Sequence, residues 1–157
     1  MVDLYEELRK LITAFDEHEI DYALCGGVAM AVYDHPRATI DIDLLILAES
    51  LDQVLAIASE LGYEIRGLDM TFAGGAIEIK RISKIERESG HLLSVDFLVV
   101  TPEIRDVWDS RVQVDREGGR LSVVSRSGLI ALKSLRGSLQ DQADIAALKE
   151  DLRDETN

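Results

Sequence analysis

Apolar residues recur at helical spacing near the start of the chain. Leu4, Leu8, Leu11, Ile12 and Phe15 fall on one face of a helix, so the pattern predicts an amphipathic first helix. Ser50 can cap a later helix that runs to residue 61, where Gly62 stops it. Further helices are expected at residues 28–33, 102–108, 127–135 and 141–152.

Between these segments, short runs alternate apolar and polar residues as strands do. The segment 40–47 alternates and then becomes continuously apolar, as expected of a strand buried on both faces. Residues 111–115 and 120–124 flank Gly118 and Gly119 and predict a hairpin. Residues 84–90 predict a charged turn. The other expected strands are 20–24, 70–72, 76–82 and 92–100.

The order of these elements predicts an α/β (α+β) fold with a mixed sheet flanked by helices. At 157 residues the chain fits a single domain, here 1–157, with a short C-terminal helical segment at about 127–152. A formal net charge of −13 argues against indiscriminate nucleic-acid binding but leaves room for a nucleotide or RNA site that a metal ion neutralises. Cys25 is the only cysteine, which excludes an intrachain disulfide and suggests a reducing cytoplasm. No apolar run is long enough to span a membrane.

Two aspartates, Asp41 and Asp43, lie in the apolar strand segment. Residues i and i+2 of a strand point to the same face, about 6.6 Å apart at about 3.3 Å per residue. Two carboxylates at that spacing can converge on divalent ions, and their oxygens suit magnesium. The simpler alternative is a pair of surface aspartates at a strand end.

Asp96 lies alone within another strongly apolar strand, residues 92–100. A buried carboxylate needs a partner, which could be a backbone group or Ser94. Asp96 could instead meet Asp41 and Asp43 across adjacent strands. Three clustered carboxylates repel one another, and a divalent ion would remove that penalty.

Gly26 and Gly27 lie between an expected strand and an expected helix. Glycines there let the backbone approach a phosphate, and the following helix N-terminus favours an anion. A tight strand-to-helix turn without a ligand is the alternative.

Together these residues resemble the nucleotidyltransferase superfamily whose fold is shared with DNA polymerase beta. That superfamily has a Gly-Gly or Gly-Ser pair opening a helix, an Asp-x-Asp on the next strand and a third acidic residue on a later strand. The chain is most similar to its AbiEii-like toxin and minimal nucleotidyltransferase branch. The features that carry this resemblance, over roughly residues 20 to 148, are Gly26-Gly27, Arg37-x-Thr39-x-Asp41-x-Asp43, Asp96, Leu129-Ile130-Ala131-Leu132-Lys133 and Asp141-Gln142-Ala143-Asp144-Ile145.

The resemblance implies transfer of a nucleoside monophosphate from a nucleoside triphosphate to an acceptor hydroxyl of RNA, protein or a small molecule. Asp41 and Asp43 would hold two Mg²⁺ ions, and Asp96 would complete one metal site and help deprotonate the acceptor. The nucleotide itself would contact Gly26, Gly27, Arg37, Thr39 and Lys133. Lys133 would otherwise be a solvated helix lysine, and Arg37 would otherwise pair with Asp41 or Asp43.

Two other classes of function stay open. The chain could be a non-catalytic interaction module, such as a toxin–antitoxin partner that keeps the fold, or a hydrolase that uses the same carboxylates. Cys25 and Trp108 are expected in the core. His18, His35 and His91 lack metal-ligand spacing and are expected at the surface or in turns.

Overall fold

A computed structural model describes residues 3–116 and 119–156. Its mixed sheet runs in the order β3-β5-β6-β2-β1-β8-β7, with β4 paired to β5. Neighbouring strands are parallel for β2–β6 and β1–β8 and antiparallel for the other pairs. The strands are β1 (Ala23–Cys25), β2 (Asp41–Ile46), β3 (Ile65–Arg66), β4 (Met70–Phe72), β5 (Ile77–Ile85), β6 (Leu92–Val99), β7 (Val112–Arg116) and β8 (Gly119–Val123).

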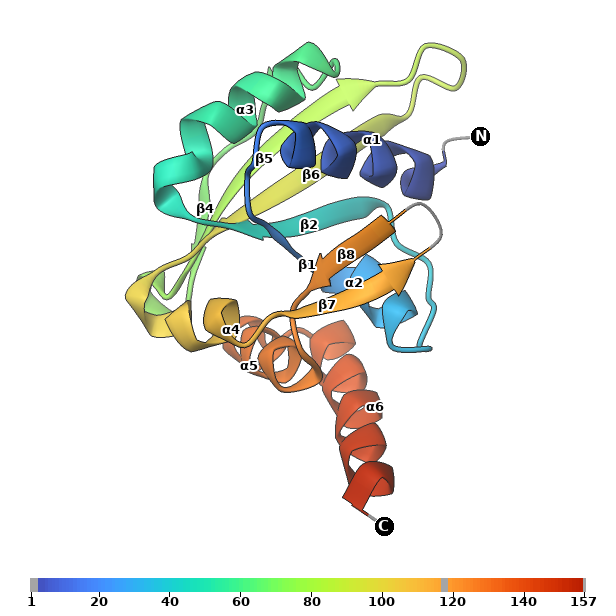
Figure 1. Ribbon diagram of the computed structural model, residues 1–157, viewed down its shortest axis with the longest axis vertical. Coiled ribbons are helices and arrows are strands. Elements are labelled where there is room, and N and C mark those ends of the chain that lie inside the picture. The colour runs from blue at the N-terminus through green and yellow to red at the C-terminus, as the bar shows by residue number, and fades with distance from the viewer. Residues whose placement is uncertain (1–2, 117–118, 157) are drawn as a thin grey trace.

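Helices cover both sides of this sheet, as Figure 1 shows: α1 and α3 lie on one side, and α4, α5 and α6 gather on the other. The helices are α1 (Leu4–Glu17), α2 (Gly26–Val32), α3 (Leu51–Glu60), α4 (Arg105–Asp109), α5 (Arg126–Arg136) and α6 (Leu139–Thr156). Three short 3-10 turns are η1 (Ala48–Ser50), η2 (Ala73–Gly75) and η3 (Pro102–Ile104). The predicted mixed sheet flanked by helices is therefore confirmed.

Helix boundaries follow local capping chemistry. The Asp3 side chain accepts hydrogen bonds from the amides of Tyr5 and Glu6 and so starts α1, whose apolar face is buried in the core. Ser125 caps α5 in the same way, and Gly137, in the left-handed conformation at φ 71°, ends it. Ser50 does precede α3, but the predicted capping hydrogen bond is wrong, because the Ser50 side chain makes none and the η1 turn leads directly into the helix.

Other boundaries also differ from the sequence prediction: β1 covers Ala23–Cys25 rather than 20–24, and α6 covers Leu139–Thr156 rather than 141–152. The second helix begins at Gly26 rather than at residue 28, so both glycines belong to α2. Strand β5 continues to Ile85, because Lys84 and Ile85 still pair with β6, and the charged turn is therefore shorter. The Lys84 side chain pairs with Glu7 and lies 4.6 Å from the centroid of the Tyr63 ring. Strand β3 was not predicted. The hairpin of β7 and β8 is confirmed, although Gly118 lies outside the described residues.

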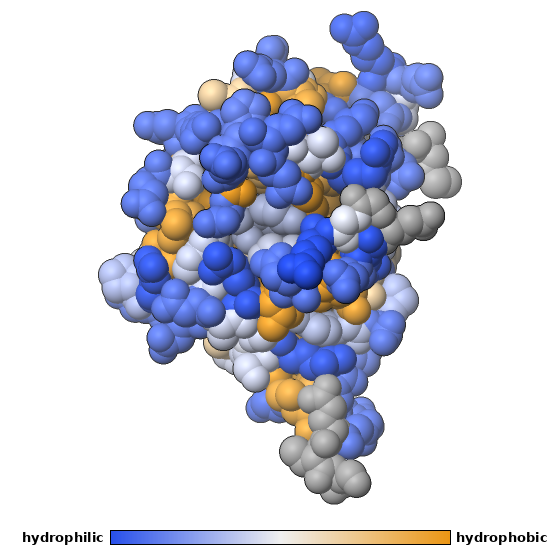
Figure 2. All heavy atoms as spheres, viewed as in Figure 1, coloured by the Kyte–Doolittle hydropathy of each residue, from blue (hydrophilic) through white to orange (hydrophobic). Residues whose placement is uncertain are grey.

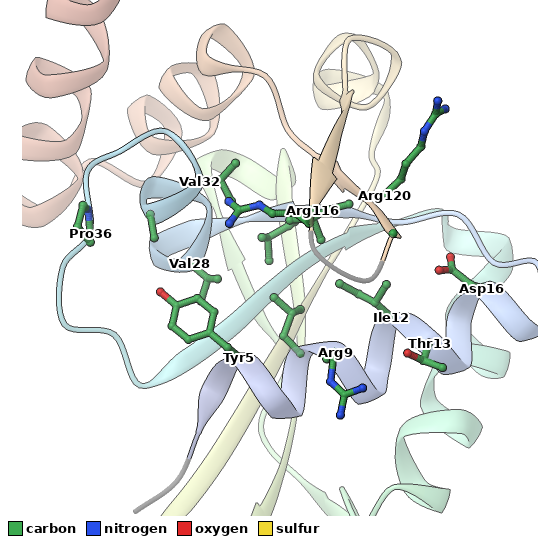
Figure 3. Close-up of a pocket in the computed structure, with 15 residues that line it drawn as sticks. Tyr5, Arg9, Ile12, Thr13, Asp16, Val28, Val32, Pro36, Arg116 and Arg120 are labelled. Atoms are coloured by element: carbon green, nitrogen blue, oxygen red, sulfur yellow. The ribbon is translucent and has the colours of Figure 1, made fainter.

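The two faces of the sheet lie against different helices. Leu24 of β1 faces a groove of about 520 Å³ between α1, α2 and β8, whereas the next residue, Cys25, faces α5. Figure 3 shows this groove, with Arg116 reaching across it toward Val32. Polar side chains cover most of the molecular face seen in Figure 2. No helix among the described residues is both long and apolar enough to cross a membrane.

Candidate active site

A row of facing side chains, most of them charged, crosses four neighbouring strands on the α5 side of the sheet. Strand register pairs Cys25 with Asp43, Asp43 with Asp96, and Asp96 with Arg81. Residues directly opposite one another on neighbouring strands project from the same face. Asp41 joins them two residues before Asp43 on β2. The predicted meeting of Asp41, Asp43 and Asp96 across adjacent strands is therefore what the register produces.

The Asp96 carboxylate is held by Arg81, a residue that the sequence interpretation missed. Arg81 Nε donates to Asp96 Oδ1 at 2.7 Å and Nη2 donates to Oδ2 at 2.9 Å, a bidentate pair. Arg81 Nη2 also lies 3.6 Å from Asp41 Oδ2. These hydrogen bonds raise the pKa of Arg81. One signal was present in the sequence, because Arg81 continues the phase of Ile77 and Ile79, whose side chains are buried.

Asp43 has the most strongly perturbed environment of the three carboxyls. Only 8% of the residue is exposed. Burial, followed by repulsion from Asp96, raises the pKa of Asp43 to about 7, against the opposing charges of Arg136 and Lys133. Burial also raises the pKa of Asp41, which Arg81 partly counteracts. The ionised form of Asp43 therefore lowers the stability of the folded protein, and such perturbed carboxyls are typical of functional sites.

Gly26 brings the main chain against the Asp43 carboxyl. A Cβ atom built on Gly26 would lie 2.0 Å from Asp43 Oδ2, far inside van der Waals contact. Gly26 also has φ +68°, a conformation that other residues rarely adopt. Glycine is therefore required here both by backbone conformation and by the approach of the carboxyl.

Gly27 leaves room in a similar way for the loop that precedes β2. Its added Cβ would lie 2.8 Å from Thr39 Oγ1 and 3.3 Å from Arg37 Cζ. Thr39 Oγ1 in turn donates to the Asp41 carbonyl at 3.3 Å. The structure thus places the two glycines and Thr39 beside the carboxylates.

Lys133 and Arg37 meet at one carboxylate of α6. Lys133 is 4% exposed, so the solvated alternative is wrong, and its Nζ donates to Asp144 Oδ2 at 2.9 Å. Arg37 Nη2 donates to the same oxygen at 3.1 Å, so its ion-pair partner is Asp144 rather than Asp41 or Asp43. Burial acts to raise the pKa of Asp144, but hydrogen bonds from Lys133, Gln140 and Arg37 outweigh it and lower the pKa.

A small cavity joins α5 to the carboxylate row. Its volume is about 10 Å³, which is room for about one water molecule. The residues that line it are Cys25, Gly26, Asp43, Leu98, Leu129, Leu132, Lys133 and Arg136. Lys133 and Asp43 therefore share a space, although the closest charged partner of Lys133 is Asp144.

The remaining sequence predictions concern the core and the histidines. Cys25 is buried, and burial raises the pKa of its thiol well above the usual range, as expected of a packed hydrophobe rather than a nucleophile. Trp108 is buried as predicted, with the Arg111 guanidinium 4.0 Å from its ring centroid. His35 Nε2 lies 2.8 Å from Asp151 Oδ2 and contacts none of the three carboxylates of the row.

A family model, the nucleotidyl transferase AbiEii toxin of type IV toxin–antitoxin systems, matches residues 9–134. The match spans most of the chain and includes the glycine pair, all three aspartates and Lys133. The chain belongs to the AbiEii nucleotidyl transferase toxin family. This membership makes it a nucleotidyltransferase and confirms the resemblance inferred from Gly26-Gly27, the Asp41/Asp43 pair and Asp96.

Solved structures share the AbiEii fold at low sequence identity. A Thermotoga maritima protein assigned as a nucleotidyltransferase is 17% identical, with a TM-score of 0.58, over 98% of this chain and 92% of its own. The antibiotic-resistance protein ANT(2'')-Ia, solved with adenylyl-2''-tobramycin, is also 17% identical, with a TM-score of 0.56, over 94% of this chain and 97% of its own. JHP933 from Helicobacter pylori is 14% identical, with a TM-score of 0.56, over 93% of this chain and 64% of its own. No curated protein matches the chain in sequence.

Whether the AbiEii carboxylates fit a magnesium ion depends on their donor atoms. Asp41 and Asp43 supply oxygen ligands from one face of β2, and a bound cation would offset both the burial and the repulsion from Asp96 that raise the pKa of Asp43. Within residues 3–116 and 119–156, no group of three or more His, Cys, Asp or Glu side chains is arranged to hold a metal ion. At this site Arg81 donates to both oxygens of Asp96. Asp41 and Asp43 offer the carboxylate oxygens that magnesium prefers, whereas the oxygens of Asp96 already accept from Arg81.

Proposed function

We propose that this AbiEii-family chain transfers a nucleoside monophosphate from a nucleoside triphosphate to an acceptor hydroxyl in a magnesium-dependent reaction. The observation that carries the proposal is the row of Asp41, Asp43 and Asp96, with the Gly26 main chain packed against Asp43. Isolated surface aspartates would not require a glycine at φ +68° beside them or a carboxyl with a pKa of about 7. The family match supports this class of reaction.

Asp41 and Asp43 would hold magnesium, which when bound screens the phosphate charges and orients the triphosphate. In the transfer step the acceptor oxygen forms a bond to the α-phosphorus. The bond from that phosphorus to the bridging oxygen of the β-phosphate breaks, and pyrophosphate leaves. Asp96, which accepts from Arg81 at both oxygens, is proposed to take the hydroxyl proton on a lone pair that Arg81 leaves free.

Cationic side chains would stabilise the leaving pyrophosphate. Lys133 and Arg37 are the proposed phosphate contacts, and in the structure both donate to Asp144. Asp144 is therefore proposed to hold the Lys133 and Arg37 side chains beside the site in the absence of nucleotide. When a triphosphate binds, its oxygens would accept hydrogen bonds from these two side chains in place of Asp144. Thr39 and Gly27 pack against each other and would fix the loop that carries Arg37.

The acceptor is proposed to be a hydroxyl of RNA, protein or a small molecule, and an antitoxin is the proposed partner within a toxin–antitoxin system. The adenylyl-tobramycin bound to ANT(2'')-Ia supports testing small molecules alongside macromolecules. The reaction is proposed for a reducing cytoplasm, which suits a chain whose one cysteine is buried and unpaired.

The test compares labels on different phosphates. The full chain, Mg²⁺ and each of the four triphosphates would be incubated with bacterial RNA, bacterial protein and small-molecule fractions. The proposal predicts transfer of an α-phosphate label to one fraction and release of pyrophosphate, both lost in Asp41→Asn. Release of γ-labelled phosphate with no transfer would indicate the hydrolase alternative. No consumption of any triphosphate would indicate a non-catalytic interaction module.

A further inference from the structure

We propose that the Arg81 guanidinium permanently replaces one of the two divalent ions expected at the carboxylate row, so that the chain binds a single ion between Asp41 and Asp43. The inference rests on the proposed function, since it concerns the metal content of the same site. It revises the number of ions and keeps the reaction class.

The geometry of the pair supports a permanent rather than a transient contact. The two hydrogen bonds from Arg81 to Asp96, at 2.7 and 2.9 Å, occupy both carboxylate oxygens in the planar fork that a guanidinium favours. The Asp96 side chain is only 4% exposed. The Arg81 side chain is 36% exposed, but its loss would leave the buried Asp96 charge uncompensated, which is unfavourable. An incoming cation would therefore have to compete with Arg81 for the Asp96 carboxylate.

The main chain of Arg81 is placed by the sheet. Strand register sets Arg81 opposite Asp96, and the Arg81 carbonyl accepts from the Gly67 amide at 2.9 Å. The arginine stem passes so close to Gly67 that a Cβ built there would lie 3.2 Å from both Cβ and Cγ of Arg81. Strand pairing therefore presents Arg81 to the row without any rearrangement of the main chain.

The charge balance of the row also favours a single divalent ion. Asp41, Asp43 and Asp96 carry three negative charges when ionised, and Arg81 contributes one positive charge within 3.6 Å of two of them. One divalent ion neutralises the remainder. Lys133 and Arg136 line the cavity beside Asp43 and add positive charge near the row, although the Lys133 ammonium is 2.9 Å from Asp144 and 3.9 Å from Asp141. A second divalent ion would leave the row with an excess of positive charge before any phosphate binds.

Native mass spectrometry of the full chain counts the ions directly. The probes are Mn²⁺, which takes the same oxygen ligands as Mg²⁺, and non-hydrolysable analogues of the four triphosphates. We expect one Mn²⁺ in the nucleotide complex of the wild-type chain and two in Arg81→Met. The matched control is Lys80→Met on the same strand, because Lys80 pairs with Asp69 and Glu78 outside the row, and it should retain one ion.

The number of bound ions distinguishes a failure of the single-ion inference from a failure of the proposed function. Two ions in the wild-type complex, or a single ion in Arg81→Met, would overturn the inference while leaving the proposed reaction intact. No nucleotide-dependent binding of Mn²⁺ by the wild-type chain would refute the proposed function itself. Should Arg81→Met lose its cooperative melting transition, Arg81→Gln replaces it, because the amide can still donate to Asp96 without its charge, and two ions are again expected.

Discussion

Replacing Asp43 by asparagine should stabilise the metal-free protein at alkaline pH. The substitution keeps the shape of the side chain and removes the charge that burial disfavours. The carboxyl ionises near 3.8 in an unfolded chain and near 7 in the folded one. Between those values the folded state binds more protons, so the contribution of Asp43 to stability falls as the pH rises and is fully unfavourable above pH 7.

The size of this effect follows from the pKa difference. One pKa unit corresponds to about 1.4 kcal/mol, so a rise from 3.8 to about 7 corresponds to about 4 kcal/mol of destabilisation at pH 8. Asp43→Asn should recover up to about 4 kcal/mol there. At pH 5 the wild-type carboxyl is already protonated in the folded state, so the two chains should differ by only about 1.7 kcal/mol.

Urea unfolding of both chains at pH 5 and pH 8, with a chelator present, measures the difference. Asp21→Asn is the matched control, because Asp21 is exposed and its replacement should change stability by little at either pH. A difference between wild type and Asp43→Asn that is the same at both pH values would refute the reasoning, since it would show that the buried charge is not what the substitution removes.

Other substitutions test the glycine and lysine contacts. Gly26→Ala should cost clearly more free energy of unfolding than Gly74→Ala, because both glycines have φ near +65° but only Gly26 has Asp43 in the way; equal losses in urea would contradict the contact. Lys133→Met should destabilise the chain by about 2 kcal/mol by removing one donor from the buried Asp144 carboxylate, which keeps its hydrogen bonds from Arg37 and Gln140. A double variant with Asp144→Leu should recover part of that loss in the same urea titration, and simple additivity would argue against the pair.

The meeting of the three carboxylates could be predicted from the sequence, because its signals are local. Asp41 and Asp43 needed only the two-residue repeat of a strand to share a face. Asp96 stood out because it interrupts an apolar strand, and the register of β2 with β6 places it opposite Asp43. Gly26 was noticed as a turn glycine, whereas its contact with Asp43 needed three-dimensional coordinates.

The charged partners could not be predicted, because they depend on which elements become neighbours. Nothing near Arg81 in the sequence indicates that β5 pairs with β6 in the register that joins it to Asp96. Asp144 follows Arg37 by 107 residues, and their contact exists only because α6 packs near the loop before β2. The same packing buries Lys133, which helical periodicity alone left as a candidate for solvent exposure.

The most direct test of the account is a thermal melt of the full chain with Mg²⁺ and each of the four triphosphates, repeated on Asp41→Asn. Ligands that bind only the folded state raise its melting temperature by mass action. The account predicts a rise with at least one triphosphate that requires Mg²⁺ and is lost in Asp41→Asn. An unchanged melting curve with every triphosphate at millimolar concentration, or an equal rise in Asp41→Asn, would contradict the assignment of this row as the metal and nucleotide site.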